Sequence, residues 1–305
     1  REAYGKALAE FGSDERIVVL DADLSKSTKT ESFKKAYPDR FINCGIAEGN
    51  MMAVAAGMAT CGKGGFASSF AMFAAGRAFE QIRNSIGYPH LNVKIGATHA
   101  GISVGEDGAT HQCLEDIGIM RTIPGMVIIN PADAVEARLA VKAAIDYEGP
   151  VYLRFGRLAV PTIFGDDYKF EIGKGVEIED GTDVTLIATG LMVPEALEAR
   201  KLLSEEGISA RVLNIATIKP IDKDIIIKAA NETGAIVTAE EHNINGGLGS
   251  AVAEVLAENS PVPMQRIGTR DVFGRSGKPS ELIKLYKLDA ASIAEAAKKA
   301  VSRKA

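Results

Sequence analysis

Residues 93–130 read VKIGATHAGISVGEDGATHQCLEDIGIMRTIPGMVIIN. A strand-like apolar run at Val93–Ala97 is followed by a glycine-rich loop, a helical pattern at Leu114–Arg121 and a second strand-like run at Val127–Asn130. This order of strand, helix and strand is typical of a βαβ unit, in which the two strands run parallel. The stretch therefore predicts a parallel sheet, and ligands of such sheets bind at the carboxyl ends of the strands.

The first half of the chain repeats this alternation on both sides of the quoted stretch. Its other strand-like runs are Ile17–Asp21, Phe41–Cys44, Gly65–Ser68 and Val151–Arg154, and its other helical patterns are Ala47–Thr60, Gly76–Ile86 and Ala132–Tyr147. We predict that residues 1–160 form one domain. The loops after its strands then lie at one edge of the sheet, where a binding site is expected; they follow Cys44, Ser68, Ala97 and Arg154.

A second domain is predicted for residues 183–305, because the alternation restarts there. Its strand-like runs are Val184–Thr189, Ala210–Ile215, Ala235–Ala239 and Met264–Ile267, and its helical patterns are Val193–Glu206, Asp222–Glu232, Gly249–Glu258, Ser280–Tyr286 and Ala290–Ser302. Residues 161–182 carry Pro161, several glycines and mixed charges, which predicts a linker with a short hairpin. The predicted fold class is α/β, with two domains that each have a mainly parallel sheet and helices on both faces.

The composition narrows the classes of protein. Hydrophobic residues make up 46% and charged residues 25%, as in globular proteins. The net charge of −5 without long blocks of like charge disfavours a nucleic-acid partner, and no apolar run reaches the roughly 18–20 residues of a membrane span. Three scattered cysteines favour neither a disulfide framework nor a zinc site, so a cytoplasmic location is expected.

Two segments at the predicted sheet edge carry candidate site residues with equally ordinary alternative explanations. Glu48, in Gly45-Ile-Ala-Glu48, follows a strand and opens a helix of small residues, where a carboxylate also complements the helix dipole. Phe70 and Phe73 lie three apart after a strand, where aromatic faces can stack on a flat heterocycle or simply pack in the core.

The loop at Thr98–Gln112 is the most informative segment. Two of the four histidines, His99 and His111, lie here with Asp107 among glycines that permit close approach of a ligand. Their spacing matches no standard metal-ligand pattern, so a functional loop without a metal is favoured. Two other groups are less informative. Arg154 and Arg157 follow a strand and can bind a phosphate or form surface ion pairs. Glu240–Gly249 ends a strand and begins a helix with several glycines, which can bind an anion or allow tight packing.

Together these segments resemble the transketolase family over nearly the whole chain, both its pyrimidine-binding domain and its C-terminal domain. The resemblance lies in Asp21-Ala-Asp23-Leu24, Gly45-Ile-Ala-Glu48, the Phe70 and Phe73 segment, and Thr98-His99 through Gly105-Glu-Asp-Gly-x-Thr-His111-Gln112. The last segment is the most specific, because both histidines and the aspartate are in register. The resemblance implies a transferase of the pentose phosphate pathway that uses thiamine diphosphate.

The resemblance also implies roles for individual residues. Glu48 would bind the pyrimidine nitrogen that activates the cofactor, and Phe70, Phe73 and Asp23 would contact the same end of the cofactor. His99 and His111 would contact substrate oxygens and relay protons. The remaining substrate-binding residues would be Asp107 at a hydroxyl, and Arg154, Arg1, Ser27 and, less centrally, Arg157 at the sugar phosphate.

The resemblance implies a partner subunit, because nothing in residues 1–305 corresponds to the family's diphosphate-binding domain. The chain would be the C-terminal subunit of a split transketolase. An N-terminal subunit would hold the diphosphate with Mg²⁺ or Ca²⁺, and no metal would be bound here. We expect a homodimer of this chain, or a heterotetramer of the α2β2 type, and no ketol transfer by the chain alone.

Two alternatives remain open. The second domain, with Lys219-Pro220-Ile-Asp222 and Val237-Thr-Ala-Glu-Glu241, equally resembles the beta subunit of a 2-oxoacid dehydrogenase or part of a deoxyxylulose-phosphate synthase. A non-catalytic regulatory or assembly subunit would keep the fold without the chemistry. The joint presence of Glu48, His99, Asp107 and His111 argues against that last reading.

Overall fold

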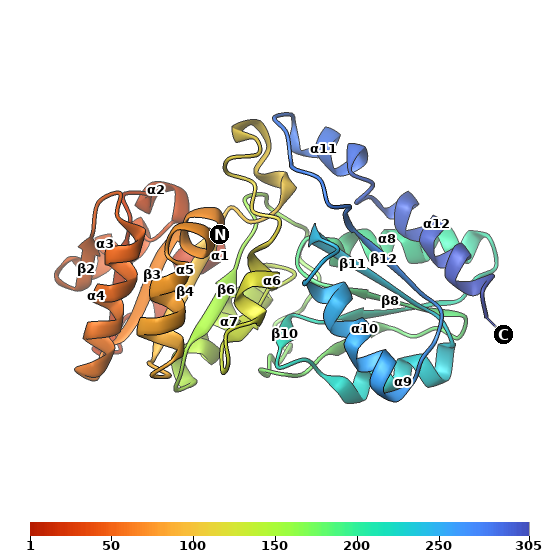
Figure 1. The fold of residues 1–305 in the computed structure, drawn as a ribbon, viewed down its shortest axis with the longest axis horizontal. Helices are drawn as coiled ribbons and strands as arrows, with labels where there is room; N and C mark the ends of the chain where they lie inside the picture. Colours follow the sequence, from red (N-terminus) through yellow and green to blue (C-terminus); the bar gives the residue numbers. More distant parts are fainter. Residues whose placement is uncertain (305) are drawn as a thin grey trace.

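The computed structural model describes residues 1–304, which form two α/β units lying side by side (Figure 1). One sheet has seven strands in the order β10-β5-β6-β4-β3-β1-β2, and the other has five in the order β12-β11-β8-β9-β7. In the described residues the pairs β10 with β5 and β7 with β9 are antiparallel, and the other pairs are parallel. The predicted fold class is confirmed.

The first sheet is built almost entirely from the first half of the chain. Its strands are β1 (Ile17–Asp21), β2 (Phe41–Asn43), β3 (Gly64–Phe70), β4 (Val93–Thr98), β5 (Val127–Ile129), β6 (Val151–Arg154) and β10 (Thr217–Lys219). Its helices α1 (Glu2–Phe11), α3 (Glu31–Ala36) and α7 (Ala134–Asp146) cover one face, and α4 (Glu48–Thr60), α5 (Phe79–Gln81) and α6 (Asp116–Arg121) cover the other.

Strand β1 shows why these strands read as unbroken apolar runs. Ile17 and Val19 pack against the face covered by α1, whereas Val18 and Leu20 pack against the face covered by α4. Successive side chains of a strand point to opposite faces, so a strand covered on both faces needs apolar residues at every position. This double burial holds the carboxyl ends of the strands rigidly in one row.

The second sheet is covered in the same way. Its strands are β7 (Val176–Glu179), β8 (Val184–Ala188), β9 (Ala210–Asn214), β11 (Ile236–Asn243) and β12 (Met264–Thr269). Helices α8 (Met192–Glu205) and α12 (Ala290–Val301) cover one face, and α9 (Lys223–Thr233) and α10 (Leu248–Asn259) cover the other. The apolar cluster beneath α4 continues into the cluster beneath α9 and α10, so the two units share one core.

The structure differs from the sequence prediction in several elements. Helices α1, α2 (Ser25–Thr28) and α3 were not predicted, and α2 and α3 are too short to show a helical period. The predicted helix Gly76–Ile86 consists of π-helical turns η2 (Met72–Arg77) and η3 (Ile82–Gly87) on either side of α5.

Two strands change the boundary between the units. Strand β7 lies inside the predicted linker 161–182, where a short hairpin was expected, but it pairs with β9, so this part of the linker belongs to the second sheet. Strand β10 was not predicted; it comes from the second half of the chain but pairs with β5 of the first sheet. Neither strand has the unbroken apolar run of the buried strands, because they read Val-Glu-Ile-Glu and Thr-Ile-Lys.

Among residues 1–304, no helix combines the length and the apolar character that crossing a membrane requires.

Candidate functional site

Two rings meet where β3 and β4 end. Phe70 is the last residue of β3 and pairs with Thr98 in β4, which places His99 just beyond it. The ring centroids of Phe70 and His99 lie 3.8 Å apart in a stacked arrangement. Both side chains are almost buried. The sheet register therefore brings together two of the predicted site residues.

Two more rings come from the π-helical turn η2, which carries Phe73, and from the loop that carries His111. Phe73 stacks on Phe70 at 5.6 Å between centroids. The ring of His111 stands edge-on to both, 5.2 Å from Phe73 and 6.2 Å from Phe70. The two histidines and two phenylalanines thus form one cluster of four rings. A π-helical turn is an energetically poor conformation that recurs at functional sites, because it re-aims side chains.

Glu48 joins this cluster through an arginine. Its carboxylate, at the start of α4, is 4% exposed and accepts hydrogen bonds from Arg77 Nη1 at 3.2 Å and 3.4 Å. The Arg77 guanidinium also lies 4.0 Å from the centroid of the Phe73 ring. Because the Arg77 side chain is 53% exposed, the carboxylate faces an open side of the subunit rather than the closed core.

The ring of His99 is held neutral. Its Nε2 lies 3.2 Å from Nη1 of Arg1, which also donates to the backbone oxygen of Ser27 at 2.9 Å. A guanidinium can only donate, so Nε2 accepts. Burial of the ring, followed by the positive charges of Arg1 and Arg157, lowers the pKa of His99 to about 3. At neutral pH the imidazole is therefore uncharged, and its Nε2 is a hydrogen-bond acceptor.

The turn after β1 presents Asp23 beside the start of α4. Asn43 Nδ2 donates to the Asp23 carboxylate at 3.0 Å, and the amides of Asp23 and Gly45 donate to Asn43 Oδ1 at 3.1 Å and 3.0 Å. Behind the turn, Asp21 accepts from two threonine hydroxyls, and burial raises its pKa. Asp23 itself is exposed, whereas Asp21 is part of the internal scaffold.

The loop between the two histidines is tethered rather than free. It forms the 3₁₀ turns of η4 (Ile102–Asp107), with Asp107 exposed at the end. Arg157 Nη1 donates to the backbone oxygen of Val104 and, at 3.1 Å, to Glu106 Oε2. Arg157 thus holds the loop that ends in Asp107. Among residues 1–304, no hydrogen bond or ring contact joins Asp107 to the four rings.

Arg154 requires a correction. It is 2% exposed, its Nε and Nη2 donate to the two carboxylate oxygens of Asp116 at 2.8 Å and 3.1 Å, and Nη2 also donates to the Glu241 backbone oxygen at 3.0 Å. Burial alone would raise the pKa of Asp116, but the Arg154 guanidinium outweighs it and lowers that pKa. This internal pairing argues against the predicted role of Arg154 in binding a sugar phosphate.

Sequence reasoning missed Arg77 and Asp116. Arg77 lies at the end of the segment already singled out for its phenylalanines, and its position four residues after Phe73 was the available signal. Asp116 opens a predicted helix and offered no signal, because its partner Arg154 is 38 residues away.

A cavity of about 300 Å³ opens next to the cluster, between the two units. Its walls include Arg1, Phe155, Arg157 and Glu241. The cations on its wall suit an anionic ligand. In the described part of the chain there is no group of three or more His, Cys, Asp or Glu residues arranged to hold a metal ion.

Comparison with known families accounts for nearly all of the chain. Residues 1–162 match the transketolase pyrimidine-binding domain, and residues 173–293 match the transketolase C-terminal domain.

Similar curated proteins include several subunits of split enzymes. A putative transketolase C-terminal section of Methanocaldococcus jannaschii is 55% identical over 97% of this chain and 94% of its own length. The 6-deoxy-6-sulfo-D-fructose transketolase subunit SqwH of Clostridium sp. is 43% identical over 100% of this chain and 95% of its own length. The transketolase of Homo sapiens is 38% identical, and the match covers 99% of this chain but 49% of the human protein.

Solved structures agree. A split gene transketolase, described as an inactive beta4 tetramer, superposes with a TM-score of 0.94 at 56% identity, covering 100% of this chain and 99% of the other. A Pichia stipitis transketolase in complex with sedoheptulose 7-phosphate superposes with a TM-score of 0.83 at 25% identity, covering 99% of this chain and 45% of the other. By its fold, by both of its domains and by these relatives, the chain belongs to the transketolase family.

Proposed function

We propose that this chain is the C-terminal subunit of a two-subunit transketolase, which transfers a two-carbon ketol unit from a ketose phosphate to an aldose phosphate. One observation carries the proposal. A buried carboxylate, two stacked phenylalanines and two histidines form a continuous path of contacts at the carboxyl edge of a parallel sheet; they are Glu48, Phe70, Phe73, His99 and His111.

The residues of this path fit the aminopyrimidine end of thiamine diphosphate. Phe70 and Phe73 offer aromatic faces for a flat heterocycle, Glu48 offers a carboxylate to a ring nitrogen, and Asp23 lies on the neighbouring turn. When bound, the cofactor supplies the carbon nucleophile that carries the two-carbon unit. Glu48 would hold a hydrogen bond at the pyrimidine, and its present partner Arg77 has an exposed side chain.

The two histidines are suited to move protons at substrate oxygens. His99 is neutral near pH 7 because burial and nearby arginines lower its pKa, so it is proposed to contact a substrate oxygen as a neutral imidazole. His111 is half-buried and stands edge-on to both phenylalanines, and it is proposed to contact a second substrate oxygen. Asp107, exposed on the connecting loop, is proposed to bind the hydroxyl next to the reacting carbonyl.

The phosphate of the sugar is proposed to bind at Arg1, Ser27 and Arg157. Arg1 and Arg157 line the same cavity of about 300 Å³, and Arg1 is bonded to Ser27 and to His99. Arg157 keeps part of its guanidinium accessible, with a side-chain exposure of 34%. Arg154 is left out of this group because its hydrogen bonds are made inside the protein.

The diphosphate and its Mg²⁺ or Ca²⁺ are proposed to be held mainly by a separate N-terminal subunit in an α2β2 assembly in the cytoplasm. Support comes from relatives that cover almost the whole chain and are named as subunits or C-terminal sections. It also comes from the split gene relative, whose assembly of beta chains alone is described as inactive. The half-open side of Glu48 is where such a partner would complete the cofactor site.

The test is reconstitution. The purified chain with thiamine diphosphate and Mg²⁺ is expected to transfer no ketol unit from xylulose 5-phosphate to ribose 5-phosphate, and addition of the N-terminal subunit is expected to restore transfer. Full transfer by the chain alone would disprove the split-subunit proposal. Activity with pyruvate and a lipoyl acceptor in place of the sugars would instead assign the chain to the 2-oxoacid dehydrogenases.

A further inference from the structure

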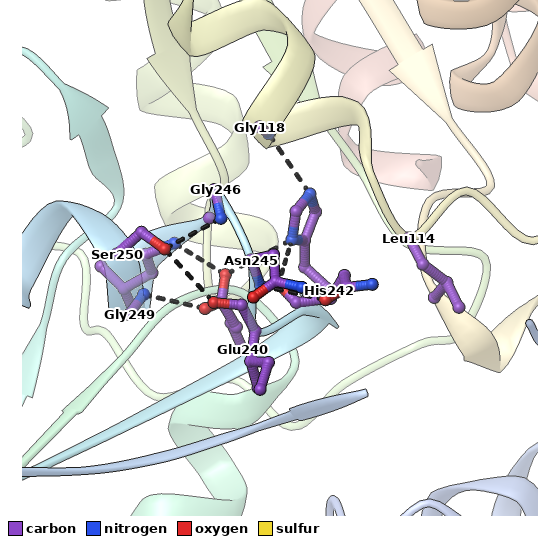
Figure 2. Close-up of polar contacts among 12 residues, drawn as sticks. Leu114, Gly118, Glu240, His242, Asn245, Gly246, Gly249 and Ser250 are labelled. Carbon is purple, nitrogen blue, oxygen red and sulfur yellow. Dashed lines mark hydrogen bonds and ion pairs between the residues drawn. The ribbon is translucent and has the colours of Figure 1, made fainter. Parts of the chain in front are cut away.

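The end of strand β11, in the second unit, lies against the loop that carries both histidines of the first unit. Asn243 N donates to the Leu114 backbone oxygen at 2.7 Å, and Gly118 N donates to Nε2 of His242 at 3.3 Å. Figure 2 shows the His242 ring facing Gly118 across this junction. These contacts hold the chain just after His111, where the loop enters α6.

His242 uses both of its ring nitrogens at this junction. Its Nδ1 lies 2.6 Å from the Asn243 backbone oxygen, and its Nε2 receives the Gly118 N–H. A ring that donates from one nitrogen and accepts at the other has both hydrogen-bonding positions filled. Beside it, the Glu240 carboxylate accepts from the amides of Leu248 and Gly249 at 2.7 Å and 2.8 Å and caps α10 (Figure 2).

Glu241 binds the other end of the same loop. Its Oε1 accepts a hydrogen bond of 2.6 Å from the amide of Ser103, in the first turn of η4, and the side chain is 3% exposed. Gly101 makes room for it, because a Cβ atom at that glycine would overlap the Glu241 carboxylate. Gly101 also has a φ of 87°, a conformation that favours glycine.

Glu241 is also tied to the first unit through its backbone. Its carbonyl oxygen accepts from Arg154 Nη2 at 3.0 Å, and Arg154 is bound in turn to Asp116 of α6. The position of the Glu241 side chain is therefore fixed by the core of the junction rather than by the loop it contacts. A rigid group that binds one amide of a glycine-rich loop selects one conformation of that loop.

We propose that Glu241 is a positioning residue, which sets the conformation of the His99–His111 loop through its hydrogen bond to Ser103. Glu241 borders the cavity of Arg1 and Arg157, but its side chain is 3% exposed and its Oε1 is bound to the Ser103 amide, so in this role it acts through the loop and not on the substrate. The catalytic consequence rests on the proposed function, whereas the effect on the loop does not. By this assignment the second unit takes part in catalysis indirectly, through the geometry of His99, Asp107 and His111.

The first test measures amide hydrogen exchange in the isolated full chain. In Glu241→Ala, exchange of the Ser103 amide and of residues 101–108 should be about tenfold faster than in the wild type, because the buried donor has lost its acceptor. Glu241→Gln should remain within about twofold, since its amide oxygen still accepts from Ser103. Glu241→Asp keeps the charge but is too short to reach Ser103, so it should accelerate exchange of the loop as Glu241→Ala does. It provides the test if Glu241→Ala does not fold.

Amides of β4 and β8 report on global unfolding, and Glu254→Gln, which breaks an exposed pair with Arg121 at the same junction, is the matched control. Wild-type exchange at Ser103 in both Glu241→Ala and Glu241→Asp would overturn the proposal. So would an equal acceleration in β4 and β8, because that result means general destabilisation instead of a loosened loop.

The second test measures ketol transfer after addition of the N-terminal subunit. Glu241→Asp should lower kcat about tenfold and leave KM for the sugar phosphate within about twofold, while Glu241→Gln should restore kcat. A change in KM alone would overturn the positioning role. If the wild-type chain shows no ketol transfer but the loop still exchanges faster in Glu241→Asp, the proposed function fails and the assignment of Glu241 stands.

Discussion

The carboxyl edges of the two sheets both carry glutamate and histidine side chains, but the surroundings of these side chains differ. At the first edge, Glu48 and His111 lie in the cluster of rings with partly accessible surroundings: the partner of the carboxylate is an exposed arginine, and His111 is half-buried, whereas both ring nitrogens of His99 have protein partners. At the second edge, Glu240 and His242 are fully buried, and protein groups fill their hydrogen-bonding positions.

The difference shows that a glutamate and a histidine at a strand end are not by themselves a site. The two edges differ in whether other groups of the chain fill the hydrogen-bonding positions of these side chains. A buried polar group with all partners present stabilises the fold, whereas one whose partner is mobile is ready for a ligand. Arg154 and Arg157, three residues apart, repeat the contrast within a single loop.

The largest expected effect is on activity at the first edge. Glu48→Ala should lower ketol transfer by the reconstituted enzyme at least about a hundredfold, because the variant loses the carboxylate proposed to bind the pyrimidine. Its unfolding midpoint in urea should stay near that of the wild type. Glu31→Ala, which removes an exposed carboxylate paired with Lys35, is the control and should keep full activity. Near-normal turnover in Glu48→Ala would contradict the proposal that the Glu48 carboxylate at the first edge binds a ligand.

The next effect is on stability at the junction. Arg154→Met should lower the free energy of unfolding by about 3–5 kcal/mol, because it leaves the Asp116 carboxylate buried without its cation. Urea unfolding followed by circular dichroism measures this loss. Arg157→Met is the matched variant and should cost about 1 kcal/mol or less, since the pair with Glu106 is exposed. Equal losses in the two variants would contradict the division between internal and open arginines.

The smallest effect is a dependence of stability on pH. The pKa of His99 falls from its ordinary value near 6.5 to about 3 on folding, so the unfolded chain binds a proton there between these values and the folded chain does not. Stability contributed by this group is present above pH 6.5 and is lost as the pH falls toward 3. The wild type should therefore lose more stability on acidification than His99→Asn, by at most about 1 kcal/mol per pH unit.

Urea unfolding at pH 7, 6 and 5 measures that slope, and His90→Asn, at an exposed histidine, is the control. Parallel curves for the wild type and His99→Asn would show that the ring is not held neutral by its surroundings.

Much of the fold was predictable because double burial leaves a strong signal. Strands β1 and β6 begin and end at the predicted residues, since both are buried throughout and apolar up to their last residues, Asp21 and Arg154. The loop of His99 and His111 could be singled out as a candidate site because ionisable residues on a glycine-rich loop are more often functional than structural. Strands β7 and β10 were not assigned from the sequence because neither has the apolar run of the buried strands: they read Val-Glu-Ile-Glu and Thr-Ile-Lys.

The sequence by itself determined the order of strands and helices, the two α/β units, and the edge at which the candidate site forms. Only the tertiary structure decided which charged residues remain open at that edge. Arg154 is held inside the protein by its ion pair with Asp116, and Glu48 is paired with the exposed Arg77. Glu241 accepts a hydrogen bond from Ser103, which is 138 residues away in the sequence. The physical reason is that periodicity is a local property of the chain, whereas the partner that satisfies a buried charge comes from wherever the fold places one.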